Sequence, residues 1–333
     1  MKKLLIIHNK YREEGGEDLS VQNEIELLKS KYHVETIFFD NYIDKRIRQI
    51  VYFLLNKNYD SAKKVNNYIE KFRPDIIYVH NTWFKASTSI FKVLKKSNVK
   101  ILIKFHNFRY SCTQSYLSKK HLKNNETCNA CGMRKKNISI FNKYFPESYL
   151  KSFFVIRYSR RYLKILKSEN FQILVLTKFH KEYLNKFGIQ DHRVHVFPNF
   201  LKISNKEKIF KDSNYIVYAG RISKEKGLNE LIESFLKVNV NMILKIIGEG
   251  PYLKTLRKRY PDKSIEFLGS IENEKVHDMI KHSKGVVTAT KLYEGQPTLL
   301  CEASLHSVPS IFPNTGGISE FFPKDYDFSF EQF

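Results

Sequence analysis

The sequence has no run of about 18 or more apolar residues in its 333 positions, so no segment is long enough to cross a membrane as a helix. Cysteine is also scarce: four in a chain of this length do not make a disulfide scaffold, so we expect a cytoplasmic protein. The start, MKKLLIIHNK, holds an apolar run of about five residues, whereas a secretory signal needs roughly 7–15. We expect this run to form a β-strand.

Acidic residues are scarce in residues 1–200, where 38 Lys and Arg face 17 Asp and Glu, a net charge of +21. Residues 201–333 carry 19 and 17, a net charge of +2. A basic first part indicates an anionic partner, which would be nucleic acid, a phosphorylated substrate or an acidic lipid surface. A lysine-rich composition without such a partner is the alternative, and charge alone does not decide between them.

Short apolar runs rich in Ile and Val alternate with helical patterns along most of the chain. The runs are 3–8, 34–39, 75–80, 100–106 and 172–177 in the first part, and 214–220, 242–248, 264–269, 285–290 and 308–313 in the second. Such runs are typical of parallel strands buried on both faces. The alternation predicts two α/β domains, at 1–200 and 201–333, because the periodicity lapses at 197–214.

One segment, about 107–168, departs from this alternation. It is polar and cysteine-bearing at first and ends in a basic, aromatic helical pattern, SYLKSFFVIRYSRRYLKILKS. We interpret it as an excursion from the first sheet followed by a helix. The aromatic, apolar and basic side chains of 156–167 would suit an acidic bilayer surface. A basic helix exposed to solvent fits the same pattern.

Two predicted loops of the second domain carry residues suited to a nucleotide, since ligands of α/β sheets bind at the carboxyl ends of the strands. After the first strand of that domain, Gly220 precedes two cations, Arg221 and Lys226, that can jointly bind a diphosphate. After the second strand, Gly248 and Gly250 form a turn that lets a ligand approach the backbone closely.

Two glutamates stand eight positions apart in YEGQPTLLCEA, the first in a loop and the second in a predicted helix. Pro297 suits the first position of that helix, which leaves the amides of Thr298 and Leu299 able to bind an anion. Carboxylates beside a phosphate site are useful mainly for neutral hydroxyls, so Glu294 and Glu302 suggest a sugar. Each feature is a weak signal alone, and their common order is a stronger one.

Five motifs of the second part follow one another as AGRISKEKGL, GEGP, FLG, EGQPTLLCEA and NTGGISE. In this order they resemble the retaining glycosyltransferases of family 4, whose E-x7-E signature the glutamate pair matches. The resemblance covers nearly the whole chain, because GGED, VHN, KFHN and FPN of the first part also stand where that family's motifs stand. It implies a GT-B fold, with two Rossmann-like parallel-sheet domains that face each other across a cleft.

The resemblance implies a role for each matched residue of the second domain. Glu302 would hold the ribose hydroxyls of a nucleoside-diphosphate sugar, and Glu294 would face the transferred sugar. Arg221 and Lys226 would neutralise the departing diphosphate. The backbone at further positions would line the donor site: Gly220, Gly248, Gly250, Thr298 and Leu299.

In the first domain, the resemblance implies that Gly15 and Gly16 let a loop close over donor and acceptor. His106 would lie near the reacting sugar, and Asn199 nearer the hinge. The family's chain normally continues beyond the GG…E turn into further helices, whereas this sequence has thirteen residues after Glu320. We therefore expect the second domain to be truncated at its C-terminal end.

The implied function is transfer of a hexose, with retention of configuration, from a nucleoside-diphosphate sugar to a glycan or lipid-linked glycan in surface polysaccharide biosynthesis. Catalysis would rest on positioning and charge stabilisation, so we expect no tightly bound cofactor or metal. We expect a protein of the cytoplasm or of the inner face of the cell membrane, without a nucleic-acid partner. The alternatives are a nucleotide-sugar epimerase of the same fold, a non-enzymatic nucleic-acid-binding protein and an inactive binding subunit.

Three cysteines of the excursion, Cys112, Cys128 and Cys131, are spaced C-x15-C-x2-C. With His106 or His121 they could provide four zinc ligands. Without a second C-x2-C pair the zinc pattern is incomplete, and reduced thiols in an acceptor-side loop are the other interpretation.

Overall fold

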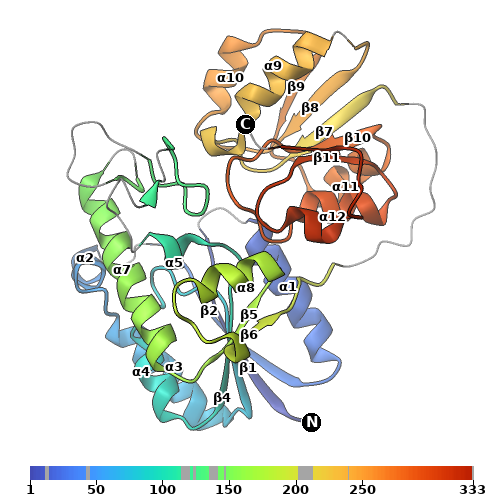
Figure 1. The fold of residues 1–333 in the computed structure, drawn as a ribbon. Helices are drawn as coiled ribbons and strands as arrows, with labels where there is room; N and C mark the ends of the chain where they lie inside the picture. The colour runs from blue at the N-terminus through green and yellow to red at the C-terminus, as the bar shows by residue number, and fades with distance from the viewer. Residues whose placement is uncertain are drawn as a thin grey trace. The chain divides into compact units, whose positions relative to one another are not determined.

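A computed structural model describes residues 1–11, 15–42, 46–113, 121–122, 125–134, 142–145, 148–201, 213–238 and 240–331. The chain forms two compact units, Met1–Phe200 (unit 1) and Leu201–Phe333 (unit 2), shown in Figure 1. Each unit contains a six-stranded parallel sheet flanked by helices. The expected α/β architecture with two sheets is confirmed.

The sheet of unit 1 has the strand order β2-β1-β3-β4-β5-β6. Its strands are β1 (Lys3–Asn9), β2 (His33–Phe39), β3 (Ile76–Val79), β4 (Lys100–Lys104), β5 (Gln172–Val175) and β6 (Val194–Val196). The described helices are α1 (Gly16–Lys29), α2 (Arg46–Leu55), α3 (Tyr59–Phe72), α4 (Ile90–Lys96), α5 (Arg109–Cys112), α7 (Tyr149–Ser168) and α8 (Lys178–Asn185). The five expected strands are confirmed. The sixth, β6, was not predicted, because His195 in its middle leaves no continuous apolar run.

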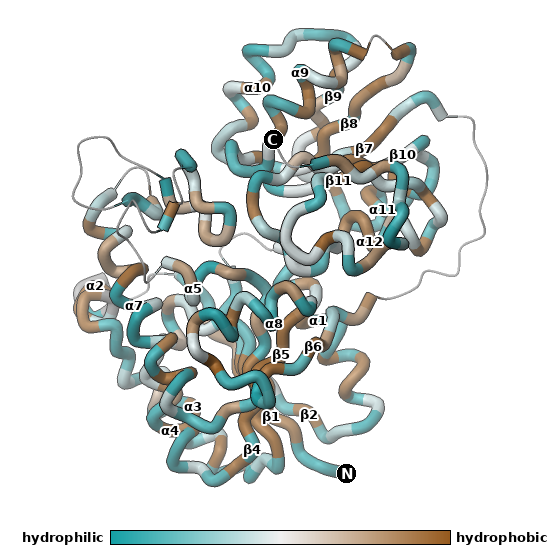
Figure 2. Tube along the Cα trace, in the orientation of Figure 1, coloured by the Kyte–Doolittle hydropathy of each residue, from teal (hydrophilic) through white to brown (hydrophobic). Residues whose placement is uncertain are grey.

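Burial on both faces explains why the strands read as continuous apolar runs. In β1, Leu5 and Ile7 belong to a cluster that includes residues of α3, α4 and α7, whereas Leu4 and Ile6 pack with residues of α1. Successive side chains of a strand point to opposite faces, so a strand covered by helices on both sides has no polar face. Figure 2 shows the strands of the sheet as hydrophobic segments.

The sheet of unit 2 has the order β12-β11-β10-β7-β8-β9. Its strands are β7 (Tyr215–Ala219), β8 (Ile243–Ile247), β9 (Ile265–Gly269), β10 (Gly285–Val287), β11 (Ser310–Pro313) and β12 (Ser329–Phe330). The described helices are α9 (Leu228–Val238), α10 (Leu253–Arg259), α11 (Asn273–Lys281) and α12 (Thr298–Leu305), with short 3-10 turns η2 (Lys224–Lys226) and η3 (Ile318–Phe321). The five expected strands are again confirmed, and the two-residue β12 is additional.

The start of α12 differs by one residue from the expectation. Pro297 is the N-cap, with an extended backbone (φ −79°, ψ 93°), so it does not take the first helical position. Its carbonyl oxygen accepts from the amides of Leu300 and Cys301, both at 3.0 Å. The amides of Thr298 and Leu299 come before the first amides that bond within the helix, so the helix itself offers them no acceptor, as expected.

The long helix α7 buries the side chains that were expected to suit a bilayer. Within 156–167, the following are at most 3% exposed: Ile156, Tyr158, Tyr162, Leu163 and Leu166. Most of these pack into the main core of unit 1. The hypothesis that this stretch places its apolar side chains in a membrane is therefore wrong, because these side chains are buried in the core of unit 1.

Candidate functional site

Two glycines of unit 2 hold the loops after β7 and β8 against each other. A Cβ on Gly248 (φ 128°) would lie 2.0 Å from the carbonyl oxygen of Gly220, and one on Gly250 (φ 159°) would lie 2.2 Å from that of Ile222. The amide of Ile222 donates to the carbonyl of Glu249 at 2.8 Å. We expected these glycines to admit a ligand, and the structure shows that they admit the neighbouring loop, which positions Arg221.

A third glycine places a lysine beside a glutamate. Gly227 follows η2 with φ 68°, and a Cβ there would lie 1.9 Å from the carbonyl oxygen of Ala289. This close approach brings the side chain of Lys226 to the loop after β10, where its Nζ forms an ion pair with Oε1 of Glu294. Thr290 Oγ1 donates to the same carboxylate oxygen at 3.1 Å. Lys226 and Glu294 are 28% and 26% exposed, so solvent or a ligand can reach the pair.

The backbone of Glu294 is set by the NTGG turn. Glu294 forms a parallel bridge with Gly316, and its carbonyl accepts from the amide of Gly317 at 2.9 Å. A Cβ on Gly316 (φ 64°) would lie 2.6 Å from that carbonyl oxygen, so only glycine fits there. Two motifs separated in the sequence therefore hold one carboxylate.

Glu302 lies one turn into α12, four residues after Thr298 and thus on the same side of the helix. It is half-buried, and burial raises the pKa of its carboxyl to about 7. Arg221 is exposed, and no carboxylate in the described part of the chain pairs with its guanidinium. The structure thus brings Lys226 and Glu294 into contact, while Arg221 and Glu302 stand on separate elements of unit 2 without a described contact to that pair.

In unit 1, histidines gather where neighbouring strands end. His106, two residues after β4, stacks on His80, which follows β3, and His80 Nδ1 lies 3.0 Å from His106 Nε2. Burial lowers the pKa of both imidazole rings well below 6.5, and the neighbouring Lys104 and histidines lower it further. Both are therefore neutral at pH 7, so one ring donates and the other accepts. His106 Nδ1 has no partner among the described atoms.

The glycine loop before α1 joins this histidine pair through an aspartate. His8 Nε2 lies 2.7 Å from Oδ1 of Asp18, and the amide of Gly15 donates to Oδ2 of Asp18 at 3.1 Å. His8 and His80 rings meet edge to face at 6.0 Å. Gly15 and its neighbour Gly16 are exposed, and among the described residues, its chain neighbours apart, no atom lies within 4 Å of a Cβ on Gly15.

The same loop reaches the segment after β4. Tyr11 donates its hydroxyl to Oε2 of Glu17 at 2.9 Å, and Asn107 Nδ2 lies 3.4 Å from the same oxygen. Burial raises the pKa of Glu17. Asn199 is buried at the end of unit 1, just beyond β6. The structure thus brings His106 close to the loop of Gly15, and the role of Asn199 near the hinge stays a prediction.

Three residues of this histidine group had no role predicted from the sequence: His8, Asp18 and His80. A signal existed, because each histidine ends an apolar run that was identified as a strand. In a parallel sheet with β1, β3 and β4 adjacent, those ends meet at one edge. The adjacency of the strands, which the sequence does not state, was the missing information.

A surface hollow of about 720 Å³ in unit 1 lies elsewhere. It is lined by residues at the amino ends of β4 and β5, including Val99, Ile101 and Phe171. The histidines stand at the carboxyl ends of the strands, so this hollow does not belong to the same site.

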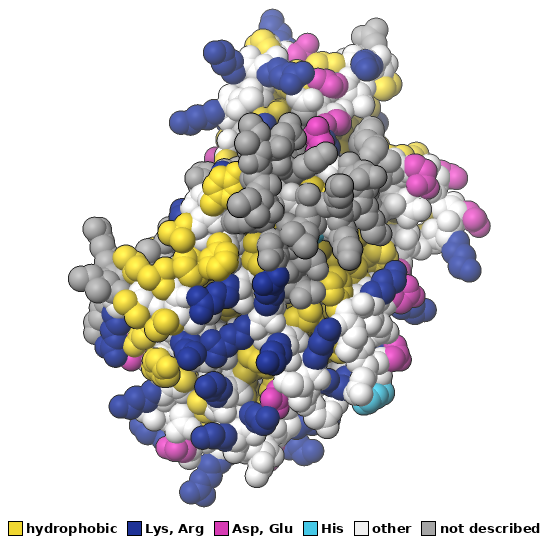
Figure 3. Space-filling view, turned by 60° about the vertical axis from the view of Figure 1, so that its left-hand side comes forward, with side chains coloured by type: hydrophobic (Ala, Val, Ile, Leu, Met, Phe, Trp, Pro, Cys, Tyr) yellow, Lys and Arg dark blue, Asp and Glu magenta, His cyan; other side chains and the backbone are white. Residues whose placement is uncertain are grey.

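Exposed apolar and basic side chains share one face of unit 1 (Figure 3). Ile50, Leu54, Leu150 and Phe153 are 38–64% exposed. They come from α2 and the start of α7, which are joined by a hydrogen bond from Arg157 Nη1 to the carbonyl of Leu54 at 3.1 Å. We call the described exposed side chains of α2 and of residues 149–153, which include Arg48 and Lys151, the apolar–basic patch. In the described residues, no helix is long and apolar enough to span a membrane.

Two family models match the chain. The one described as "Glycosyltransferase Family 4" matches residues 29–204, more than half of the chain, and the one described as "Glycosyl transferases group 1" matches residues 199–330. The two matches together extend over both units.

Among curated proteins, the chain is 31% identical over 113 residues to the putative teichuronic acid biosynthesis glycosyltransferase TuaC of Bacillus subtilis, covering 34% of this chain and 28% of that protein. It is 26% identical over 153 residues to the amylovoran biosynthesis glycosyltransferase AmsD of Erwinia amylovora, covering 42% of each. The chain thus spans less than half the length of these two relatives.

Among solved structures, the lipopolysaccharide outer core galactosyltransferase WaaB in its apo form superposes with a TM-score of 0.61 at 16% identity, over 99% of this chain and 86% of that one. Anabaena Alr3699/HepE, in complex with UDP and glucose, superposes with a TM-score of 0.66 at 14% identity, over 100% and 86%. At such identities the likeness shows the fold alone. From the matched models, the motif order and the two parallel sheets, we conclude that the chain belongs to glycosyltransferase family 4 and has the GT-B fold.

Proposed function

We propose that this protein is a retaining glycosyltransferase that moves a hexose from a nucleoside-diphosphate sugar to a glycan or lipid-linked glycan acceptor. The observation that carries the proposal is the Lys226–Glu294 ion pair, which is positioned by the close backbone contacts of Gly227 and Gly316 in unit 2. The names of the relatives support a role in surface polysaccharide biosynthesis, since two of them are named as glycosyltransferases of teichuronic acid and amylovoran biosynthesis.

The ion pair suggests how donor binding prepares the site. A diphosphate between Arg221 and Lys226 would compete with Glu294 for the lysine. Glu294 would then turn its carboxylate to the hydroxyls of the transferred hexose, while Thr290 keeps its hydrogen bond to Oε1. The two cations stabilise the negative charge that develops on the leaving phosphate, so we propose that no metal or other cofactor is needed for transfer.

Glu302 would bind the ribose of the donor. As a carboxylate it accepts two hydroxyl hydrogen bonds, and the amides of Thr298 and Leu299 at the start of the same helix suit the diphosphate. HepE has been crystallised with UDP and with UDP-glucose, which makes uridine the first base to test here.

The acceptor would meet the histidine pair of unit 1. The free Nδ1 of the neutral His106 can donate to or accept from a sugar hydroxyl, and His80 fixes the ring. No residue here is assigned as an enzymic nucleophile, in keeping with attack on the same face of the sugar as the leaving group.

The first test is a thermal-shift titration with UDP, GDP, ADP and CMP on the wild-type chain and on Arg221→Ala and Glu302→Ala. We expect one diphosphate to raise the melting temperature of the wild type and neither variant to respond. Stabilisation that persists in both variants would refute the assigned donor site.

The second test uses the corresponding nucleotide sugar with a membrane glycolipid extract, and NMR of the product's anomeric proton. Retention of the donor's anomeric configuration in a glycolipid product is expected. An altered free sugar formed without the extract would instead identify an epimerase, and inversion would refute the retaining mechanism.

The apolar–basic patch supports a membrane-associated acceptor. Apolar side chains on α2 and α7 can enter the headgroup region while the cations of unit 1 meet anionic lipid. We expect sedimentation with vesicles of phosphatidylcholine and phosphatidylglycerol but not of phosphatidylcholine alone. The double variant Leu150→Ser/Phe153→Ser should lose binding, while Val238→Ser, an exposed apolar site on unit 2, should retain it.

A further inference from the structure

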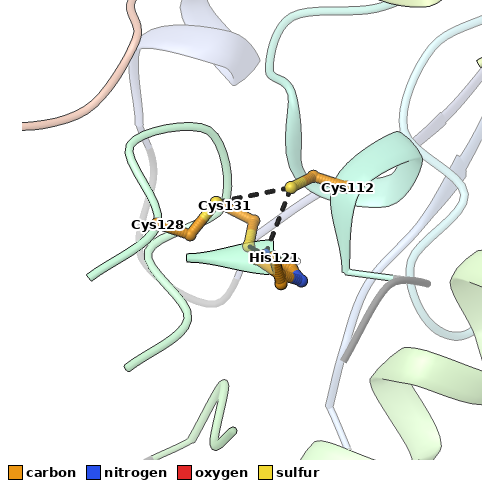
Figure 4. A group of neighbouring side chains, drawn as sticks. All are labelled: Cys112, His121, Cys128 and Cys131. Carbon is orange, nitrogen blue, oxygen red and sulfur yellow. Dashed lines mark hydrogen bonds between the residues drawn. The ribbon is translucent and has the colours of Figure 1, made fainter. Parts of the chain in front are cut away.

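Four side chains of the excursion after β4 converge on one point. Cys112 lies at the end of α5, and His121, Cys128 and Cys131 come from the segment that follows it (Figure 4). Their three Sγ atoms and one ring nitrogen all lie within 4.8 Å of one another, and all four residues are buried. His106, the other candidate ligand in the sequence, lies with His80 instead.

Three distances within the cluster are slightly shorter than those of a tetrahedral zinc site. Cys112 Sγ lies 3.3 Å from His121 Nε2 and 3.4 Å from Cys128 Sγ, and His121 Nε2 lies 3.1 Å from Cys131 Sγ. Zinc bonds of about 2.3 Å to sulfur and about 2.0 Å to nitrogen put ligand atoms about 3.5–3.8 Å apart at tetrahedral angles. These three pairs would need to separate by no more than about 0.5 Å to enclose such an ion, and the remaining pairs lie within 4.8 Å.

A cluster of reduced thiols is a poor explanation for this arrangement. A thiol is a weak donor and a weak acceptor, so three of them around one imidazole nitrogen gain little from hydrogen bonding. Nor do the sulfurs form a disulfide, since all the cysteines are free and the Cys112–Cys128 separation of 3.4 Å is well beyond a bond. Pairing any two would also leave the third thiol and the histidine without a role.

The local backbone presents the two cysteines of the C-x2-C turn to the same side. The amide of Gly132 donates to the carbonyl of Cys128 at 2.8 Å, and the amide of Cys128 donates to that of Met133 at 2.9 Å. Gly132 has φ 74°, which glycine adopts without strain. Apolar side chains close around the cluster, with Met133 fully buried and Ile156 of α7 3% exposed.

We propose that Cys112, His121, Cys128 and Cys131 bind one Zn²⁺ ion as a structural site. Three cysteines and one histidine are a known ligand set for structural zinc, and four protein ligands leave no open position for catalysis. The site would stabilise a segment whose described strand pairings are single bridges, Thr127–Arg134 and Arg134–Lys143. It would also tether that segment to α5, three residues beyond His106 in the chain.

The test is zinc analysis by inductively coupled plasma mass spectrometry on the full chain, purified without chelator. We expect about one zinc per wild-type chain and a loss of most of it in Cys128→Ser and Cys131→Ser. Cys301→Ser is the matched control, because Cys301 is a buried free cysteine in unit 2, and its zinc content should equal that of the wild type.

A histidine substitution keeps the proposal falsifiable if the serine variants misfold. His121→Cys creates the four-cysteine ligand set, so it should retain about one zinc, whereas His121→Ala should lose it. Replacement of the native ion by Co²⁺ should give the visible absorption of a tetrahedral thiolate site. A chain without zinc but with four titratable thiols would refute the proposal, as would a disulfide or an iron–sulfur chromophore.

The outcome is separable from that of the proposed function. Removal of the ion by a chelator should expose the excursion to limited proteolysis and lower the stability of unit 1. Stabilisation by a nucleoside diphosphate depends on residues of unit 2 and should survive. Loss of zinc with no change in proteolysis or stability would contradict a structural role.

Discussion

The two units use the same architecture but build their candidate sites in different ways. In unit 2, backbone loops touch one another so closely that glycine is required at Gly227, Gly248, Gly250 and Gly316. In unit 1, the exposed Gly15 has open space around it, and the site consists of buried side chains, chiefly the histidines at the ends of β1, β3 and β4. A site made from backbone contacts leaves a glycine pattern in the sequence, whereas one made from side chains of distant strands leaves little.

The largest expected effect tests the contrast between the closely packed glycines of unit 2 and the exposed Gly15 of unit 1. Gly248→Ala places a Cβ 2.0 Å from a carbonyl oxygen, so we expect unit 2 to lose about 4 kcal/mol of stability, measured by urea unfolding followed by circular dichroism. The single tryptophan, Trp83, lies in unit 1, and its fluorescence transition should not move.

Gly15→Ala is the matched substitution in unit 1. It should change stability by no more than about 0.5 kcal/mol, because no atom of the described residues beyond the chain neighbours lies within 4 Å of the added carbon. If both alanine variants were equally stable, the difference drawn between the two sites would be wrong.

The next effect concerns the charge pair of unit 2. Lys226→Ala should lower kcat/KM by about 10²–10³-fold, because it removes a cation from the leaving group. The control is Lys291→Ala, which removes the neighbouring ion pair to Glu230 at a similar exposure and should leave kcat/KM nearly unchanged. An equal loss in both variants would mean that the site needs positive charge in general and not this lysine.

A third effect separates the units by their response to acid. His180 is fully buried against Phe108, and burial lowers its pKa to about 3, so the folded chain excludes a proton that the unfolded chain binds below about pH 6.5. Above pH 6.5 His180 therefore costs the fold no stability of this kind. Below pH 6.5 the free energy of unfolding decreases as the pH falls, by about 2 kcal/mol at pH 5.

His180→Phe should therefore stabilise unit 1 at pH 5 relative to pH 8, measured by the unfolding of Trp83 fluorescence in urea. Each variant is compared with the wild type at the same pH, so that packing changes cancel in the difference. The same increment at both pH values would show that His180 does not titrate as proposed.

The smallest effect has the opposite sign and belongs to unit 2. Burial raises the pKa of Glu302 to about 7, so between about pH 4.5 and 7 the folded chain holds a proton that the unfolded chain releases. Stability from this group is present below pH 4.5 and is lost as pH rises through 7. After discounting for partial exposure, Glu302→Gln should be more stabilising at pH 8 than at pH 5 by about 1 kcal/mol. Calorimetry at the two pH values measures this difference, and a change of opposite sign would contradict it.

Among the described residues, ten of the twelve strands were predicted from apolar runs, because burial on both faces leaves a strand no polar side to interrupt the run. β6 was missed because His195 interrupts its apolar residues, and β12 because it has only two residues. In the site, the residue types at Lys226 and Glu294 were predicted, but their direct contact was not. The contact depends on the close approach of two loops at Gly227, and sequence motifs do not show which loops approach each other.

The cysteine segment shows the same limit. The spacing predicted Cys112, Cys128 and Cys131 as ligands but left two histidines as candidates for the fourth. The structure places His121 beside the three cysteines, whereas His106 contacts His80. The basic helix was predicted correctly as a helix, but its apolar side chains were assigned to the wrong environment. Amphipathic patterns report that a face is apolar and do not report what covers it.

By itself, the sequence determined the two α/β sheets and the family, because these follow from local periodicity and from motifs with fixed spacing, and from the same motifs it predicted most candidate site residues. Only the tertiary structure decided which residues meet: Lys226 with Glu294, His80 with His106, and His121 with three cysteines. The physical reason is that these contacts join residues distant in sequence or on separate loops. Their geometry is set by strand order and by close backbone packing, and neither has a period that a sequence can display.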